Sequence, residues 1–259
     1  MTATAVPVQE PGTLTVYGRA AAAEWLRLRT VRSTWWCLLA ATVTIVGIGV
    51  IMAFDAENVT ASGDLPPATS AGEFGVLLGQ FALLVMVLLA VTQEYASGSI
   101  TPTLQWTPRR GVLLAARVSV PVLAAAVAGV VLALVADVSA WLIADLSLSS
   151  GGVTDSLGRI AAVLVAGGVL AVGVGLFLRS TAGALATVFL LQLVLPFLLP
   201  AFGVQWMADL GELLPGSGAI WTLLGEPEMT AGQATALLVG WSGVALVAGG
   251  WSLLRRDAG

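Results

Sequence analysis

The sequence predicts an all-α integral membrane protein with six transmembrane helices, and three observations carry this prediction. Of 259 residues, 58% are hydrophobic and only 10% are charged, whereas soluble proteins carry about 25% charged residues. Six apolar runs reach the length of about 20 residues that a helix needs to cross a hydrocarbon core. The arginines also gather on one side of these runs, and the acidic residues on the other. We expect one six-helix domain over residues 19–259, after a mobile cytoplasmic tail over residues 1–18.

The apolar runs between charged residues give the spans in order. The first run lies between Arg32 and Asp55 and predicts a span over about residues 33–54. Its basic flank is typical of a secretory signal, but the run is longer than the usual 7–15-residue signal core and no A-x-A site closes it. We therefore expect this helix to be retained. The remaining predicted spans cover about residues 74–93, 118–140, 160–178, 181–202 and 232–254.

The distribution of charge predicts the orientation. Six spans place both termini on one side, and arginine near span ends is retained in the cytoplasm during insertion. With the termini inside, only Arg159 of the eleven arginines falls outside. We therefore expect a multi-pass protein of the bacterial cytoplasmic (inner) membrane with cytoplasmic termini. The arginines expected inside are Arg19, Arg27, Arg29, Arg32, Arg109, Arg110, Arg117, Arg179, Arg255 and Arg256.

Missing residue types exclude several classes of enzyme. The chain has no histidine and no lysine. The chain therefore cannot contain a phosphate-binding loop that uses lysine, an H-E-x-x-H zinc site or a Ser-His-Asp triad. The single cysteine, Cys37, cannot form an intrachain disulfide and is expected to be a buried, inert thiol. We predict no catalytic, cofactor-binding or metal-binding residues, and any ATP hydrolysis in a partner chain.

Three polar residues in the predicted spans are candidates for a substrate path. Asp137 interrupts the third run, and an intramembrane carboxylate is a functional hypothesis by default. It follows Arg117 by about 30 Å of helix, near the outer interface, where a solvated carboxylate is the simpler interpretation. Gln80 and Gln192 are the other two candidates.

The connector over residues 93–117, between the second and third spans, has the pattern of a short ordered structure. Gly98 favours the end of the second span. Pro102 suits the first turn of a short helix, and Pro108 ends it. The simpler alternative is a tight loop with a positively charged anchor. Leu104 and Trp106 are available for a partner surface, and Arg109 and Arg110 mark the membrane entry of the third span.

This connector, "QEYASGSITPTLQWTPRRGVLLAARV", resembles the cytoplasmic connector of type-two ABC exporter permeases. In that family an E-[YF]-x-x-G-[ST]-[IL] element follows the second span, and a coupling segment and a Pro-Arg pair come next. The matching positions are Glu94, Tyr95, Gly98, Ser99, Ile100, Pro108, Arg109 and Arg110.

Two further segments are similar to the same family. Ala22 to Leu39 is similar to its N-terminal elbow helix, although the charges scatter around the helical wheel and an ordinary basic flank is the alternative. Leu199 to Gly225 looks like its outer helical hairpin between spans five and six, with a greasy external loop as the alternative. The elbow residues singled out are Trp25, Leu28, Arg29 and Arg32.

The resemblance implies a permease subunit that couples to a separate cytoplasmic ABC ATPase and pairs with a second copy or a paralogue. It also implies export, and the sparse polar groups of the spans suit a hydrophobic or amphiphilic substrate. Membrane lipid is an expected partner, and nucleic acid is not. A stand-alone secondary transporter, which would need coupling ions and usually inverted repeats, remains an alternative. So do a membrane-embedded enzyme and a non-transporting scaffold.

Small residues recur at helical spacing in the second and fourth spans. Such residues allow close approach of helices in a membrane. We expect packing inside the bundle rather than a seam between two copies. The residues are Gly75, Gly79, Gly167, Ala171 and Gly175.

Overall fold

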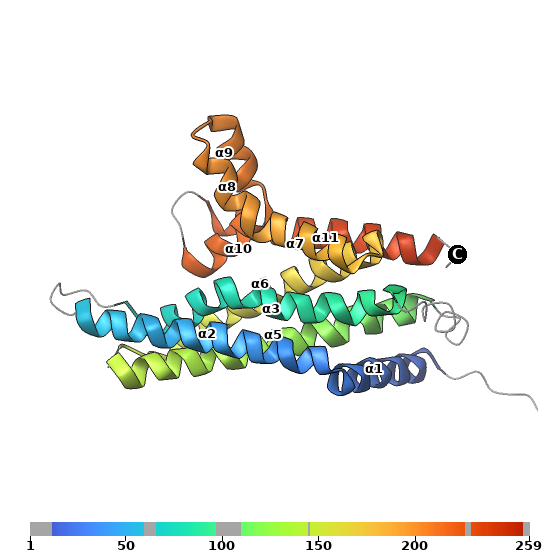
Figure 1. Ribbon diagram of the computed structural model, residues 1–259, viewed down its shortest axis with the longest axis horizontal. Helices are drawn as coiled ribbons and strands as arrows, with labels where there is room; N and C mark the ends of the chain where they lie inside the picture. The colour runs from blue at the N-terminus through green and yellow to red at the C-terminus, as the bar shows by residue number, and fades with distance from the viewer. Residues whose placement is uncertain (1–11, 60–65, 97–109, 145, 226–228, 256–259) are drawn as a thin grey trace, which may run out of the picture.

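The computed structural model describes residues 12–59, 66–96, 110–144, 146–225 and 229–255, and their regular structure is helical throughout, without strands. The helices that precede the bend in the fifth span are α1 (Thr13–Thr30), α2 (Arg32–Val59), α3 (Thr69–Ala96), α5 (Arg110–Ala144), α6 (Ser150–Leu178) and α7 (Thr181–Phe189). The remaining elements are η2 (Leu190–Val194), α8 (Leu195–Ala201), α9 (Gln205–Glu212), α10 (Pro215–Leu224) and α11 (Ala231–Arg255) (Figure 1).

Six helical stretches are long and apolar enough to cross a membrane, so the predicted all-helical fold with six candidate membrane spans is confirmed. Three helices begin earlier than the predicted spans, because charged residues were used as span limits. Glu73, Arg117 and Arg159 instead lie inside α3, α5 and α6, where each side chain has an ionic partner. The candidate spans are Arg32–Ala56, Thr69–Gln93, Gly111–Ala144, Ser150–Leu178, Thr181–Ala201 and Ala231–Leu253.

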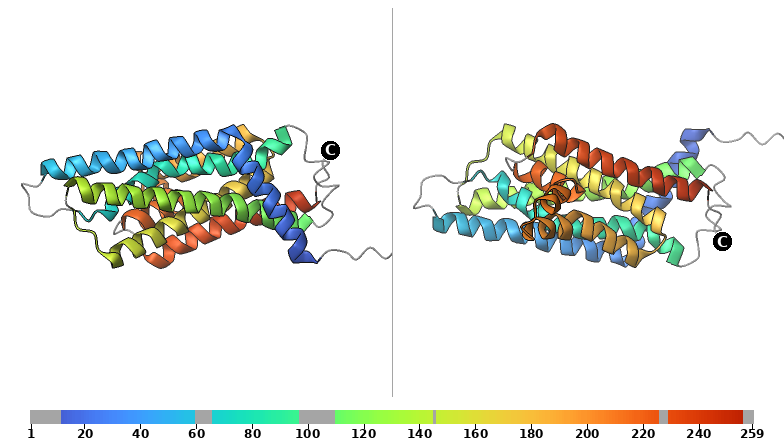
Figure 2. Two further views of the ribbon diagram at one scale, coloured as in Figure 1. Left: turned by 90° about the horizontal axis from the view of Figure 1, so that it is seen from below. Right: turned by 90° about the horizontal axis from the view of Figure 1, so that it is seen from above.

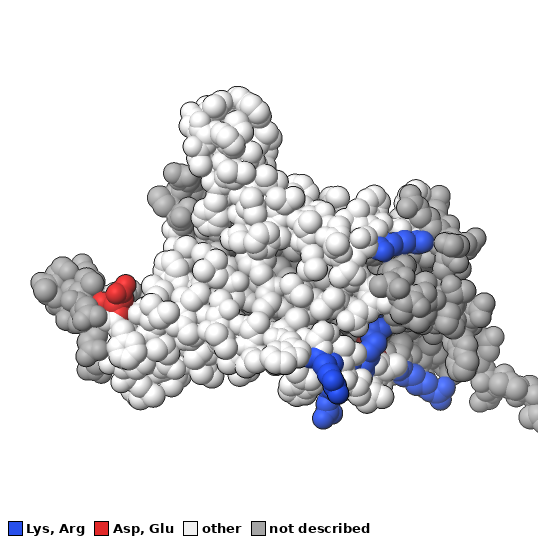
Figure 3. All heavy atoms as spheres, viewed as in Figure 1, with Lys and Arg blue, Asp and Glu red and all other residues white. Residues whose placement is uncertain are grey.

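The long helices lie side by side along the longest axis of the molecule, and α1 crosses α5 at one end (Figures 1 and 2). That end also holds the last turn of α11. Figure 3 shows arginine side chains at this end and acidic side chains at the opposite end. We call them the arginine-rich end and the acidic end.

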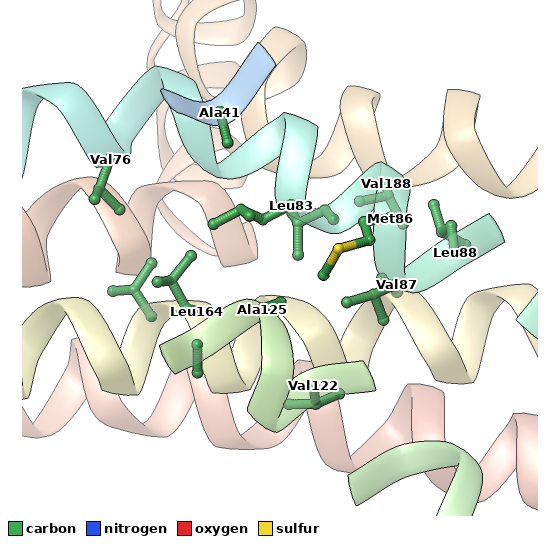
Figure 4. Packing of buried hydrophobic residues seen from close by; sticks show 14 of the residues in the cluster. Ala41, Val76, Leu83, Met86, Val87, Leu88, Val122, Ala125, Leu164 and Val188 are labelled. Carbon is green, nitrogen blue, oxygen red and sulfur yellow. The ribbon is translucent and has the colours of Figure 1, made fainter. Parts of the chain in front are cut away.

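Helix α3 occupies the centre of the bundle, because it packs against α2, α5 and α6. Its leucines Leu83 and Leu88 are fully buried and lie among apolar side chains of the neighbouring helices, such as Leu164 of α6 and Val122 of α5 (Figure 4). Lipid tails are as apolar as these side chains, so close van der Waals contact is what favours helix association inside a membrane.

Glycines allow the closest helix contacts. A Cβ atom at Gly75 would lie 2.6 Å from the backbone oxygen of Ile45, and one at Gly79 would collide with the Ile45 side chain. The glycines of α6 that were predicted to pack internally face α3 and η2. The prediction of internal packing is therefore confirmed. The sequence analysis missed a further crossing, where a Cβ atom at Gly249 of α11 would collide with the carbonyl of Gly173 in α6.

The fifth candidate span is bent. It begins as α7 along the bundle and passes through the π-helical turn η2, where the N–H of Leu195 donates to the carbonyl of Leu190. Pro196 follows, and proline has no backbone N–H to continue the regular ladder. The paired helices α8 and α9 then project sideways from the bundle (Figures 1 and 2). Gly203, with φ of 70°, makes the turn between them.

Helix α10 returns from this projection and packs against η2, α3, α6 and α11. It begins with Pro215, which suits the first helical position. A Cβ atom at Gly216 would collide with the carbonyl oxygen of Gln192, so the first turn of α10 lies directly against η2. Helix α10 thus packs beside the bundle at the place where the fifth candidate span bends away from it.

Candidate functional site

Helix α1 begins within the predicted tail over residues 1–18 and overlaps the predicted elbow over residues 22–30. It is attached to α5 by buried polar groups. Glu24 of α1 is 7% exposed and Arg117 of α5 is 1% exposed. Glu24 Oε1 lies 3.4 Å from Arg117 Nε, and Glu24 Oε2 lies 3.1 Å from Arg27 Nη2. About two turns before Glu24 on α1, the hydroxyl of Tyr17 is hydrogen-bonded to that of Ser119 of α5 at 2.8 Å. These contacts fix both the position and the rotation of α1.

This arrangement explains why the charges of α1 scatter around its helical wheel. Glu24 faces α5, where a buried arginine needs a carboxylate because desolvation of an unpaired charge is costly. Arg19 and Arg29 are exposed. Within the described part of the chain, Glu24 is the carboxylate that contacts both Arg27 and Arg117. The scatter could not be interpreted from the sequence alone, because the sequence does not show where α5 lies relative to α1.

The four predicted elbow residues fall into two groups. Leu28 is buried beneath α1, whereas Trp25, Arg29 and Arg32 are exposed. Val31 interrupts the helix in an extended conformation, and α2 begins at the next residue. Trp35 Nε1 donates to the Arg29 carbonyl at 3.1 Å, which ties the start of α2 to the end of α1.

The predicted coupling site falls mostly outside the described residues. Only its two ends are described, as the last turn of α3 and the first residue of α5, and both lie at the arginine-rich end. The side chains of Glu94, Tyr95 and Arg110 are not among those described. The remaining predicted coupling residues, outside the described ranges altogether, are Gly98, Ser99, Ile100, Leu104, Trp106, Pro108 and Arg109.

Asp137 is fully buried, so the interpretation of a solvated carboxylate is wrong. Its Oδ1 accepts a hydrogen bond of 2.8 Å from the backbone N–H of Gly72. Gly72 lies in the first turn of α3, where backbone N–H groups lack partners within the helix and the helix dipole favours negative charge. Asp137 therefore caps α3 from a neighbouring helix. Its second oxygen, Oδ2, has no hydrogen-bond partner among the described residues.

Arg159, the one arginine predicted on the acidic side, pairs with an acidic residue on that side. Its Nη2 forms an ion pair with Glu73 of α3. Its Nη1 lies 3.5 Å from the carbonyl of Thr222 and 3.4 Å from that of Leu223, in the last turn of α10. Cations are favoured next to the carbonyls of a helix C-terminus. Arg159 thus joins α3, α6 and α10 near the acidic end.

The structure does not bring the three predicted path residues together at a described cavity. Gln80 is 1% exposed and donates from Nε2 to the Leu77 carbonyl of its own helix at 3.0 Å. Gln192 is 5% exposed, within η2. Asp137 is occupied with α3.

Three of the larger cavities that described residues line lie elsewhere. An apolar cavity of about 280 Å³ lies between α3 and α7, beside the edge-to-face pair of Phe81 and Phe189. One of about 270 Å³ lies beneath the α8–α9 projection. The largest, of about 760 Å³, is an apolar groove between α1, α2, α3 and α5. Among the described residues, no group of three or more histidine, cysteine, aspartate or glutamate side chains could hold a metal ion.

Comparison with known proteins adds no assignment. No model of a protein family matches the sequence, and no curated protein matches it. The resemblance to type-two ABC exporter permeases therefore stays a prediction that depends on the quoted motifs.

Proposed function

We propose that the chain is the transmembrane subunit of an ATP-driven ABC exporter in a bacterial cytoplasmic membrane. It would form part of the path of a hydrophobic or amphiphilic substrate. It would work with a separate cytoplasmic ATPase and with a second copy or a paralogue. The observation that carries the proposal is that both ends of the connector lie at the arginine-rich end, where α1 packs against α5 (Figure 1).

The positive-inside rule puts the arginine-rich end in the cytoplasm, where an ATPase has access to nucleotide. The chain has no lysine for a phosphate-binding loop, so ATP-driven work requires a second polypeptide. The connector between α3 and α5 is the surface that we assign to that ATPase. We assign α1 as the elbow and residues 199–225, from the end of α8 through α10, as the outer helical hairpin.

The contacts around Arg117 support a mechanism for transmitting force. Arg117 follows Arg110 by about 10 Å of helix, and it binds Glu24 of α1. A push on the connector would move the ends of α3 and α5. It would reach α1 through the Glu24–Arg117 pair and the Tyr17–Ser119 hydrogen bond. The elbow and two central helices would then move as one unit during nucleotide binding.

The test is a complex of the chain with a cytoplasmic ATPase that co-purifies with it, reconstituted into vesicles. Trp106→Ala and Gly98→Val should leave membrane insertion intact and uncouple ATP hydrolysis from the transport of amphiphilic compounds. The matched control is Ser147→Ala in the connection between α5 and α6 at the acidic end, where the side chain is exposed. Unchanged coupling in both connector variants, or no ATPase partner at all, would refute the proposal.

A further inference from the structure

The groove of about 760 Å³ between α1, α2, α3 and α5 owes its shape to small side chains. Ala21 and Ala22 of α1 and Ala124 and Ala128 of α5 are among the residues that line it. The groove residues on α5 recur at helical spacing from Val120 to Ala128, so the groove follows that helix for about 12 Å. Its volume lies within the range of about 300–1,000 Å³ that is usual for small-molecule sites.

The groove opens toward the surroundings of the bundle. Leu123 and Val127, which line it from α5, are 57% and 63% exposed. Around a membrane-spanning helix such surfaces meet lipid tails. An elongated apolar chain is therefore the kind of group that fits the long part of the groove.

The arginine-rich mouth of the groove has a different chemistry. Arg29, Trp25 and Trp35 line it there, and tryptophan is enriched at the level of the lipid headgroups. Glu24, the acidic residue described on α1, is already paired with Arg27 and Arg117. Within the described part of the chain, Arg29 has no ion-pair partner. The mouth therefore carries a net positive charge next to an apolar groove.

We propose that this groove holds one anionic phospholipid of the leaflet at the arginine-rich end, with an acyl chain along α5 and the headgroup phosphate at Arg29. Charge complementarity selects this occupant, because basic pockets between helices near the cytoplasmic face bind anionic headgroups. A zwitterionic lipid would fill the apolar part equally well and would gain less at the mouth. The proposal needs the membrane location of the chain and is independent of exporter activity.

The test uses the full-length chain in vesicles of phosphatidylcholine with or without phosphatidylglycerol. The readout is the lipid retained after extraction, by native mass spectrometry. We expect a preference for phosphatidylglycerol of about fivefold, which corresponds to about 1 kcal/mol for one arginine at the membrane surface. Arg29→Gln should abolish the preference and keep total retention. Arg19→Gln removes the same charge from an exposed site on the same helix that does not line the groove, and it should keep the preference.

Filling the groove tests its apolar part. Ala128→Phe should release both lipids, whereas Val131→Phe, at an exposed position of α5 that does not line the groove, should release neither. Three results would overturn the proposal. They are equal retention of both lipids by the native chain, the same loss of preference in Arg19→Gln and Arg29→Gln, and dissociation of a dimer by Ala128→Phe with lipid retention unchanged. The last result would assign the groove to a second copy of the chain.

Discussion

The carboxylate of Asp137 in α5 accepts a hydrogen bond from the backbone N–H of Gly72 in α3, so a side chain of one span completes the first turn of another. The contact is buried, and a Cβ atom at Gly72 would lie only 2.6 Å from Asp137 Oδ1. This relationship gives a carboxylate inside an apolar bundle a structural role that needs no substrate.

Asp137→Asn should therefore be tolerated, because the amide oxygen still accepts the Gly72 N–H. Asp137→Leu should lower the free energy of unfolding by about 1–3 kcal/mol, since it leaves that buried donor without a partner. Unfolding in detergent, followed by circular dichroism, measures both. Asp155→Leu removes an exposed carboxylate near the start of α6 and serves as the control. Equal stability of Asp137→Leu and the control would contradict the capping role.

The Glu24–Arg117 pair should respond unequally to the loss of each partner. Glu24→Leu removes one carboxylate partner of the buried Arg117 and should lower the free energy of unfolding by about 1.5–3 kcal/mol, the usual contribution of a hydrogen bond to a charged group. Arg117→Met should cost less, because Glu24 keeps Arg27. The double variant should be more stable than Glu24→Leu alone. Thermal unfolding in detergent gives the order of stabilities, and the reverse order for the two single variants would rule out this account of the junction.

The crossing of α6 and α11 should tolerate no side chain at Gly249. Gly249→Ala forces a Cβ atom onto the Gly173 carbonyl, and we expect a loss of about 1–3 kcal/mol from overpacking. Gly240 lies in the same helix with open space around it. Gly240→Ala should gain about 0.5–1 kcal/mol, because alanine is the better helix former. Both changes are measured as shifts in melting temperature, and a stabilising Gly249→Ala would show that the two helices are further apart.

The orientation can be tested with single cysteines in a Cys37→Ser background. A thiol reagent that cannot cross the membrane should modify Asp55→Cys in intact cells, because this exposed position lies near the acidic end. It should modify Arg19→Cys only after the membrane is opened. Labelling of Arg19→Cys in intact cells would reverse the orientation and remove the ATPase from the connector.

The helical class and the six candidate spans were predictable because apolar runs of about 20 residues are unambiguous for a membrane. The ends of the helices were not. Charges at Glu73, Arg117 and Arg159 mark the ends of apolar runs, but their pairing lets the helices continue through them. Which charges pair depends on which helices are neighbours, and that information is absent from a one-dimensional pattern.

In the candidate site, too, part of the structure could be predicted from the sequence and part could not. The predicted elbow segment, Ala22 to Leu39, is divided between the end of α1 and the start of α2, and its attachment to α5 through Glu24 was missed. The signal was present, since Glu24 is the single acidic residue among the arginines from Arg19 to Arg32. The burial of Asp137 could not be predicted from its distance along the helix, because the N-terminus of α3 makes burial favourable there.

The bend at η2 has a consequence for how the chain is made. Thr181–Ala201 is one continuous apolar stretch, so the insertion machinery recognises it as a complete membrane segment. In the folded molecule, however, only its first part follows the bundle, and Gly216 of α10 rests on Gln192 where the path diverges. We therefore expect biogenesis to follow an order, in which the segment enters the bilayer straight and tilts aside after α10 has been synthesised and has docked.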